Sequence, residues 1–266
     1  MSGVGAVLAK AKTQGRAALV GYLPVGYPDV PGSIDAMVAM VEAGVDIVEI
    51  GVPYTDPLMD GPVIAHAADV ALAGGTRLVD VFTAVRAVAD AGAPALVMTY
   101  WNPVLRYGVD RFADDLAKAG GAGLITPDLI PDEGAQWMAA ADRNGLDHVF
   151  LVAPSSTPQR LRSTTAACTG FVYAASTMGV TGTRATVGDA AEVLVNRTRQ
   201  MTHTPICVGL GVSTGAQAAQ VATFADGVIV GSALVGALAD AGSREDGIIA
   251  IRKLSAELAA GVRAGR

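Results

Sequence analysis

The segment 48–61, VEIGVPYTDPLMDG, contains three acidic side chains in a setting that suits acid–base chemistry. Glu49 interrupts an apolar run, where burial of an unpaired carboxylate is costly. Asp56 and Asp60 follow in a proline-bounded loop. Glu49 could instead neutralise a buried arginine or cap a helix. At the carboxyl end of a parallel strand, beside an acidic loop, a catalytic acid or base is the favoured interpretation.

Other groups that could carry a reaction are scarce. None of the lysines ends a predicted strand, which disfavours a Schiff-base mechanism. They are Lys10, Lys12, Lys118 and Lys253. His148 and His203 fall at the opposite end of the predicted strands, and no cluster has metal-ligand spacing. We therefore predict that no metal is used and that Glu49 and Asp60 carry the chemistry.

Three late loops are rich in glycine: 178–182, 209–214 and 231–234. Ser232 stands where a short helix would begin, and helix starts present free N–H groups to phosphate. Such loops after two consecutive strands match the usual phosphate site of an α/β barrel, although ordinary turns also use glycine. We predict a phosphate site there.

Further polar side chains end predicted strands: Tyr22, Tyr100, Asn102, Asp128 and Tyr173. Tyr22 and Tyr173 could line a pocket for an aromatic substrate, or could simply pack. Asp128 fits either a substrate contact or a turn before a helix.

Short β-rich runs alternate with helical patterns along the chain. The predicted strands are 17–23, 46–50, 95–99, 122–126, 147–152, 170–175, 205–208 and 226–230. Predicted helices include 3–12, 62–73, 134–143 and 244–262. The strands are almost continuously apolar, which is typical of strands covered on both faces.

Eight such units predict a single (β/α)₈ TIM-barrel domain over 1–266, with an extra N-terminal helix and short helices in the loops. An open doubly wound sheet is the alternative. It is disfavoured because 21–26, GYLPVG, lacks the Gly-x-Gly-x-x-Gly spacing expected after its first strand.

Composition limits the partners. With 51% hydrophobic and 17% charged residues, the chain can build a large core. Its net charge of −6 argues against nucleic-acid binding. Mean hydropathy is +0.41, yet no apolar stretch reaches the roughly 18 residues of a membrane span, and no secretory signal is evident. Cys168 and Cys207 lie in apolar settings far apart, so we predict free thiols and a cytoplasmic location.

Along nearly its full length the chain resembles the tryptophan synthase alpha subunit family. The 48–61 motif is highly specific, and supporting stretches are 98–103, 127–131, 179–182 and 230–235. The resemblance implies cleavage of indole-3-glycerol phosphate to indole and glyceraldehyde 3-phosphate, with no cofactor in this chain. Indole would then pass through a tunnel to a beta subunit that carries pyridoxal phosphate, in a tetramer of two alpha and two beta subunits.

The resemblance also assigns residue roles. Glu49 would be the principal general acid and base, and Asp60 would contact the indole N–H. Phosphate would be held by Gly182, Gly211, Gly231 and Ser232. Substrate contacts are expected from Tyr22, Tyr100, Asp128, Tyr173 and Thr181, the last of which would meet Asp60 on loop closure. The beta subunit would face loop 53–60, through Pro53, Asp56 and Pro57, and loop 178–190.

Two departures from the family pattern affect loops. Met59 stands where a small residue is usual, and Thr177-Met178 replaces a pair that commonly includes arginine. Two other functions remain open: a self-sufficient lyase that needs no beta subunit, and a non-catalytic phosphate-binding barrel that serves as a scaffold. The presence of both Glu49 and Asp60 disfavours the scaffold.

Overall fold

The computed structural model describes residues 3–175, 189–209 and 211–265, and its strands form one parallel sheet. The strand order is β5-β4-β3-β2-β1-β9-β8-β7-β6. The strands are β1 (Ala18–Pro24), β2 (Ile47–Gly51), β3 (Ala95–Met98), β4 (Gly123–Ile125), β5 (Asp147–Val149), β6 (Leu151–Val152), β7 (Val172–Ala175), β8 (Ile206–Gly209) and β9 (Gly227–Val230).

The sheet closes on itself at Phe150. Strands β5 and β6 are the two ends of the sheet order, yet only this residue separates them in the chain. β5 pairs with β4, and β6 pairs with β7. The predicted strand 147–152 is therefore interrupted once, where the Phe150 N–H donates to Cys168 Sγ instead of a neighbouring strand. The predicted (β/α)₈ TIM barrel is confirmed.

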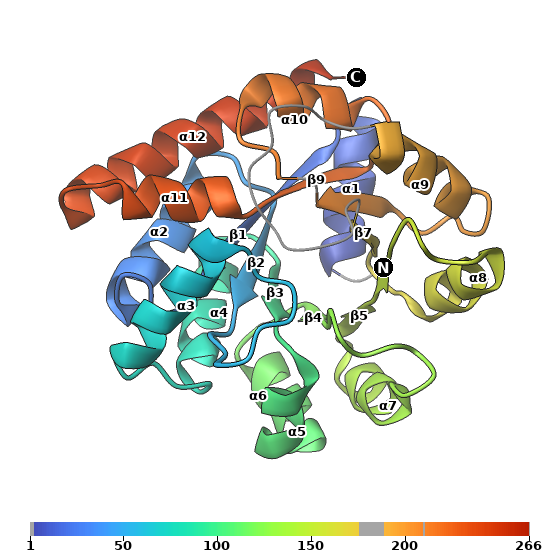
Figure 1. Ribbon diagram of the computed structural model, residues 1–266, viewed down its shortest axis with the longest axis horizontal. Coiled ribbons are helices and arrows are strands. Elements are labelled where there is room, and N and C mark those ends of the chain that lie inside the picture. Colours follow the sequence, from blue (N-terminus) through green and yellow to red (C-terminus); the bar gives the residue numbers. More distant parts are fainter. Residues whose placement is uncertain (1–2, 176–188, 210, 266) are drawn as a thin grey trace.

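Helices form a ring around the barrel (Figure 1). They are α1 (Gly3–Thr13), α2 (Val30–Glu42), α3 (Pro62–Ala73), α4 (Asp80–Asp90), α5 (Trp101–Tyr107), α6 (Val109–Lys118), α7 (Ala135–Asn144), α8 (Pro158–Ala167), α9 (Asp189–Arg199), α10 (Gly215–Ala222), α11 (Ser232–Ala239) and α12 (Arg244–Ala264). Helices α1, α3, α5 and α11 are additional to the one helix per strand that a barrel needs. None of the helices in the described ranges is long and apolar enough to cross a membrane.

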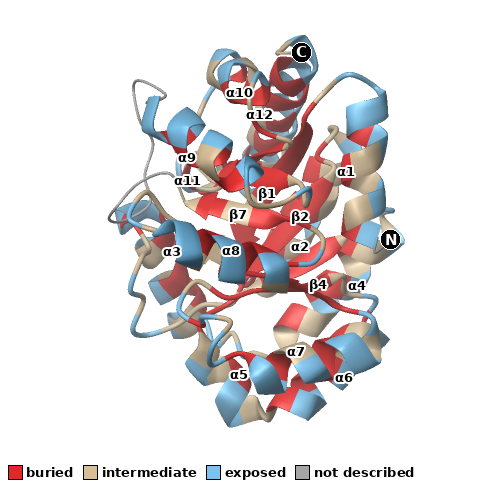
Figure 2. Cartoon of the chain, turned by 90° about the vertical axis from the view of Figure 1, so that its right-hand side faces the viewer, coloured by how far each residue is buried: buried red, intermediate tan, exposed pale blue. Residues whose placement is uncertain are grey.

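Strand alternation divides the core into two clusters. Ile47 belongs to the cluster inside the barrel, whereas Val48 and Ile50 belong to the cluster between the sheet and its helices. Buried strands run through the centre and exposed helix faces lie outside (Figure 2). Because side chains alternate along a strand, Glu49 shares the inward face with Ile47. Helix α1 closes the N-terminal end of the barrel, where Val4 and Leu8 pack into the inner cluster.

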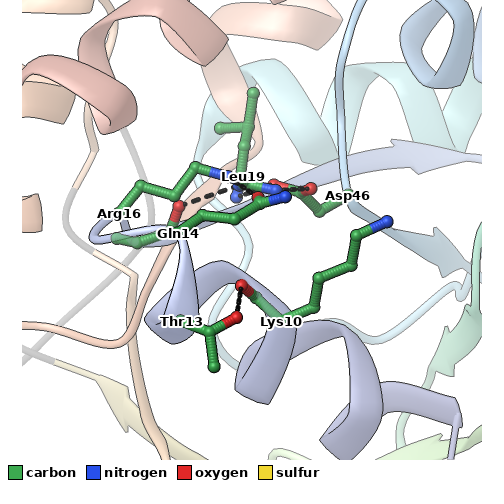
Figure 3. Close-up of polar contacts among 7 residues, drawn as sticks. Lys10, Thr13, Gln14, Arg16, Leu19 and Asp46 are labelled. Carbon is green, nitrogen blue, oxygen red and sulfur yellow. Dashed lines mark hydrogen bonds and ion pairs between the residues drawn. The ribbon is translucent and has the colours of Figure 1, made fainter.

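An ion pair fixes the chain where it leaves α1. Arg16 donates from Nη1 and Nη2 to the two carboxylate oxygens of Asp46, at 2.7 and 2.8 Å. The Leu19 N–H donates to Asp46 Oδ2 at 2.9 Å (Figure 3). One aspartate at the start of β2 therefore holds both the preceding turn and the first strand.

Candidate active site

Glu49 is fully buried on the inward face of β2, two residues before the strand ends at Gly51. Neither carboxylate oxygen has a hydrogen-bonding partner among the described residues. Burial raises the pKa of Glu49 to about 8, because the charged form loses its hydration. Near neutral pH this side chain is therefore mainly a protonated acid, which can give up a proton and take one back.

Tyr22 and Tyr173 stand beside Glu49 in the barrel mouth. Tyr22 lies opposite Glu49 in the pairing of β1 with β2. Burial raises the pKa of Tyr22 well above its usual value, and the negative charges of Asp60 and Glu49 raise it further. The pKa of Tyr173 is raised by burial and then by Glu49. The structure thus brings four of the predicted site residues, Tyr22, Glu49, Asp60 and Tyr173, into one region.

Two glycines make room for the tyrosine rings. A Cβ added to Gly51 would lie 2.3 Å from the Tyr22 hydroxyl oxygen, and one added to Gly209 would lie 2.6 Å from that of Tyr173. Both distances are too short for a real side chain. Our sequence reasoning missed these two positions. The signal was available, because Gly51 lies two residues after Glu49 and so faces the same side of the strand.

Tyr100 holds Asp60 in place. Its hydroxyl donates to Asp60 Oδ1 at 3.0 Å and accepts from the Met59 N–H at 3.0 Å. Burial raises the pKa of Asp60, and the hydrogen bond from Tyr100 opposes that rise. Tyr54, which sequence reasoning also missed, packs on Tyr100 with ring centroids 5.5 Å apart and accepts from Asn102 Nδ2 at 3.1 Å. The loop after β2 is therefore anchored to the end of β3.

Asp128 caps a helix. Both of its carboxylate oxygens accept from the Trp101 N–H, at 2.9 and 3.1 Å, which caps the first turn of α5. This cap on a helix 27 residues earlier in the chain differs from both roles that the sequence left open, and the substrate contact stays a prediction. Asp56 is exposed and accepts from the Thr55 hydroxyl, and Pro53 and Pro57 are partly exposed nearby in the chain.

The predicted phosphate site includes the start of α11. Ser232 is the first residue of α11, is buried, and is separated from β9 only by Gly231. Gly211, with a φ of +69°, comes after the neighbouring strand β8. First-turn N–H groups of a helix have no acceptor within the helix, and the helix dipole adds partial positive charge. Gly231 precedes Ser232 as the N-cap, while Thr181 and Gly182 lie outside the described residues, as do Thr177 and Met178.

His148 and His203 lie away from this mouth, as the sequence suggested. His148 contacts Asp142 and the carbonyl of Ala167 at the N-terminal end of the barrel. Over the ranges that the structure describes, no group of three or more His, Cys, Asp or Glu side chains is placed to hold a metal ion.

Comparisons with known proteins all point to one family. The family model described as tryptophan synthase alpha chain matches residues 8–263. The tryptophan synthase alpha chain of Mycobacterium avium (strain 104) is 63% identical over 262 residues, which cover 98% of this chain and 95% of the relative. That of Mycobacterium tuberculosis (strain ATCC 25177 / H37Ra) is 61% identical over 264 residues, 99% of this chain and 96% of the relative.

Solved structures agree with these relatives. A structure of Mycobacterium tuberculosis tryptophan synthase contains a chain that superposes with a TM-score of 0.92 at 60% identity, and the match covers 98% of each chain. A tryptophan synthase subunit alpha from Legionella pneumophila str. Paris superposes with a TM-score of 0.90 at 30% identity, again over 98% of each chain.

Proposed function

The chain belongs to the tryptophan synthase alpha chain family and cleaves indole-3-glycerol phosphate to indole and glyceraldehyde 3-phosphate; we propose that Glu49 moves both protons of this reaction. The observation that carries the proposal is the Glu49 side chain itself. It is buried on the inward face at the barrel mouth, and no described group occupies its oxygens. Its raised pKa suits proton transfer in both directions.

In the proposed mechanism, protonated Glu49 first gives its proton to C3 of the indole ring. The ring nitrogen then bears positive charge, and ionised Asp60 stabilises its N–H. Next, the bond between C3 and the side-chain carbon breaks, and its electron pair returns to the ring to form indole. The hydroxyl on that carbon becomes the aldehyde carbonyl as its proton passes to Glu49, which restores the acid. Tyr22 and Tyr173 are proposed to line the indole pocket.

Glu49→Gln tests the assignment. Glutamine keeps the size of the side chain but cannot exchange a proton, so we expect kcat to fall by about 10²–10⁴-fold with KM little changed. Glu42→Gln is the matched control, because Glu42 lies on the surface and pairs with Arg252. Near-normal indole release by a folded Glu49→Gln protein would exclude Glu49 as the proton carrier.

The phosphate is proposed to bind at Gly211, Gly231 and Ser232, with Gly182 as a further contact. The support is the buried start of α11 beside the loop after β8. Gly231→Asp should raise KM for indole-3-glycerol phosphate by about 10–100-fold, because the new carboxylate repels phosphate. Cleavage of a dephosphorylated analogue should change much less. Equal effects on both substrates would mean that the substitution only disturbs the fold near Tyr22.

Membership in this family implies a beta-subunit partner. We propose that the partner docks over the loops after β2, β3 and β4. The segments after these neighbouring strands expose large apolar side chains: Leu58 in the loop after β2 at 73%, Leu105 on α5 at 53% and Ile130 in the loop after β4 at 41%. Such residues gain stability when a partner covers them. Pro53, Asp56 and Pro57 belong to the same surface, next to Leu58 in the chain.

The finer details of the assembly are part of the proposal. They are a tetramer of two alpha and two beta subunits, pyridoxal phosphate in the beta subunit, no cofactor in this chain, and a cytoplasmic setting for its two free cysteines. The assembly is tested by measuring indole release with and without the cognate beta subunit. We expect strong activation, which Leu58→Asp should weaken. If the pure chain is already fast and the partner adds nothing, the chain is a self-sufficient lyase.

A further inference from the structure

Three aspartates lie at the N-terminal ends of strands. Asp46 comes directly before β2, Asp226 directly before β9, and Asp147 is the first residue of β5. Asp46 and Asp226 lie one and three residues before Ile47 and Ile229 of the inner cluster, so strand alternation turns them away from the barrel interior. Asp147 instead shares the inward face of its strand with Val149.

Two of the three are fully partnered in the same way. Asp46 accepts from the Leu19 N–H and pairs with Arg16. Asp226 accepts from the Ile206 N–H at 3.0 Å and pairs with Arg199, whose Nη1 lies 3.1 Å from Oδ2. In both cases an arginine cation satisfies a carboxylate that is largely removed from water.

Asp147 lacks this arrangement. It is the most buried of the three, at 3% exposure, and its Oδ2 has no hydrogen-bonding partner among the described residues. No lysine or arginine of the described segments forms an ion pair with it. Lys118, at the end of the helix that leads to β4, lies against Asp115 instead. The carboxylate is turned toward Gly170, where an added Cβ would lie 2.9 Å from Oδ2.

A cavity of about 740 Å³ opens beside Asp147. It lies at the N-terminal end of the barrel, between α1 and the turns that lead into β5, β7 and β8. Helix α1 runs along this end in Figure 2. Apolar walls come from Leu8, Ala9, Leu146 and Pro205. The volume falls within the range of small-molecule sites.

We propose that this cavity binds a small organic cation, a primary ammonium or guanidinium group on an apolar body, with Asp147 as the counter-ion. The cation would supply to Asp147 the positive charge that Arg16 and Arg199 supply to Asp46 and Asp226. The apolar body would lie against α1 and Pro205.

The other charges at the cavity leave this role to Asp147. Arg199 lines the cavity but is paired with Asp226, and the other two basic side chains that line it, Lys12 and His203, are exposed. Asp142 also lines it, but is exposed and faces His148. An inorganic metal ion is a poor fit, because the described residues offer no group of three metal ligands there. An unpaired buried carboxylate favours a cation over an anion or a neutral ligand.

Benzylamine is a suitable probe, and benzyl alcohol is its neutral match. Binding to the full chain is followed by amide NMR shifts of Thr169 and Gly170 at probe concentrations up to about 10 mM. We expect saturable shifts with benzylamine and at least tenfold weaker binding of benzyl alcohol. Asp147→Asn should weaken benzylamine binding at least tenfold, whereas Asp142→Asn, at the rim, should change it by less than about threefold.

A second variant keeps the test decisive if Asp147→Asn fails to fold. Ala9→Phe on α1 fills the cavity without touching the carboxylate and should also abolish the shifts. Benzylamine should not compete with indole-3-glycerol phosphate, because the lyase site is at the other end of the barrel. The proposal is overturned by absent saturation, by equal binding of the two probes, by undiminished binding to either Asp147→Asn or Ala9→Phe, or by competitive inhibition of indole release.

Discussion

With the exception of Asp147, the carboxylates described at the two ends of the barrel have opposite surroundings. At the N-terminal end, Asp46 and Asp226 each accept from a strand N–H and pair with an arginine. At the mouth, Glu49 has no hydrogen-bonding partner in the described structure, and Asp60 receives one hydrogen bond from the neutral hydroxyl of Tyr100. The residue types are the same, but the groups around them differ.

The difference shows what separates a structural carboxylate from a chemical one. The side-chain hydrogen bond to Asp46 is the main cause that raises the pKa of Arg16, so the charged form of Arg16 is stabilised. At the mouth, burial raises the pKa of Glu49, which has no described partner, and that of Asp60, where the hydrogen bond from Tyr100 opposes the rise. At the N-terminal end, a fixed charged pair holds strands together. At the mouth, a carboxyl group that can exchange its proton can take part in a reaction.

The largest expected effect that tests this contrast is on turnover. Asp60→Asn removes the negative charge proposed to stabilise the ring N–H, so kcat should fall by about 10²–10³-fold. Asp226→Asn makes the same chemical change at the other end and should leave kcat of the folded protein within about twofold. Comparable losses of kcat in two folded variants would contradict the division between the two ends.

The next largest expected effect is a loss of stability, and it should come from the N-terminal end of the barrel instead of the mouth. Asp46→Asn breaks a nearly buried ion pair with Arg16, so the free energy of unfolding should fall by about 2–3 kcal/mol. Urea unfolding measures the loss, with indole release at saturating substrate as the control for function. An unchanged midpoint would mean that the Arg16–Asp46 pair does not stabilise the fold.

Much of this organisation was predictable from the sequence. Apolar runs with a single carboxylate located β2 and Glu49, and the alternation of strands with helices gave the barrel. Helices 3–12 and 62–73 were placed to within one residue of α1 and α3. These features follow from local patterns that a barrel repeats, so one sequence is enough to read them.

Features that depend on contacts distant in sequence were harder to foresee. The break at Phe150 arises from Cys168, 18 residues away, and the cap on α5 is supplied by Asp128, 27 residues away. The predicted helix 244–262 is confirmed as α12, but not all of its apolar residues are covered, because Ile249 is 58% exposed. An amphipathic period marks a face only approximately, whereas the neighbours decide which residues are covered.

The third expected effect is the pH dependence of stability. Glu49 has a folded-state pKa of about 8, against 4.5 for the ordinary group, so between these values the folded state binds the extra proton. Raising the pH across that window removes the proton and destabilises the fold. Relative to Glu49→Gln, the wild type should lose roughly 1.4 kcal/mol per pH unit from about pH 4.5 to about 8. Parallel stability curves for the two proteins would show that Glu49 is ionised throughout.

The smallest expected effect concerns how Asp60 is held. Tyr100→Phe removes the hydroxyl that donates to Asp60 and accepts from the Met59 N–H, so kcat at neutral pH should fall by only about 3–10-fold. The hydrogen bond favours the ionised form of Asp60 and therefore lowers its pKa. Without it that pKa rises, so activity should be lost at a higher pH as the solution is acidified.

A pH profile of kcat for the wild type and Tyr100→Phe measures this displacement of the acid limb. Tyr107→Phe is the matched control, because it removes a hydroxyl that donates to Asp115, in the helix layer away from the mouth. Its acid limb should coincide with that of the wild type. A Tyr100→Phe protein with a lower kcat but an unmoved acid limb would show that Tyr100 contributes only to packing around the loop. A displaced limb would show that a single neutral donor, in place of the arginine used at the other end, sets the charge of Asp60.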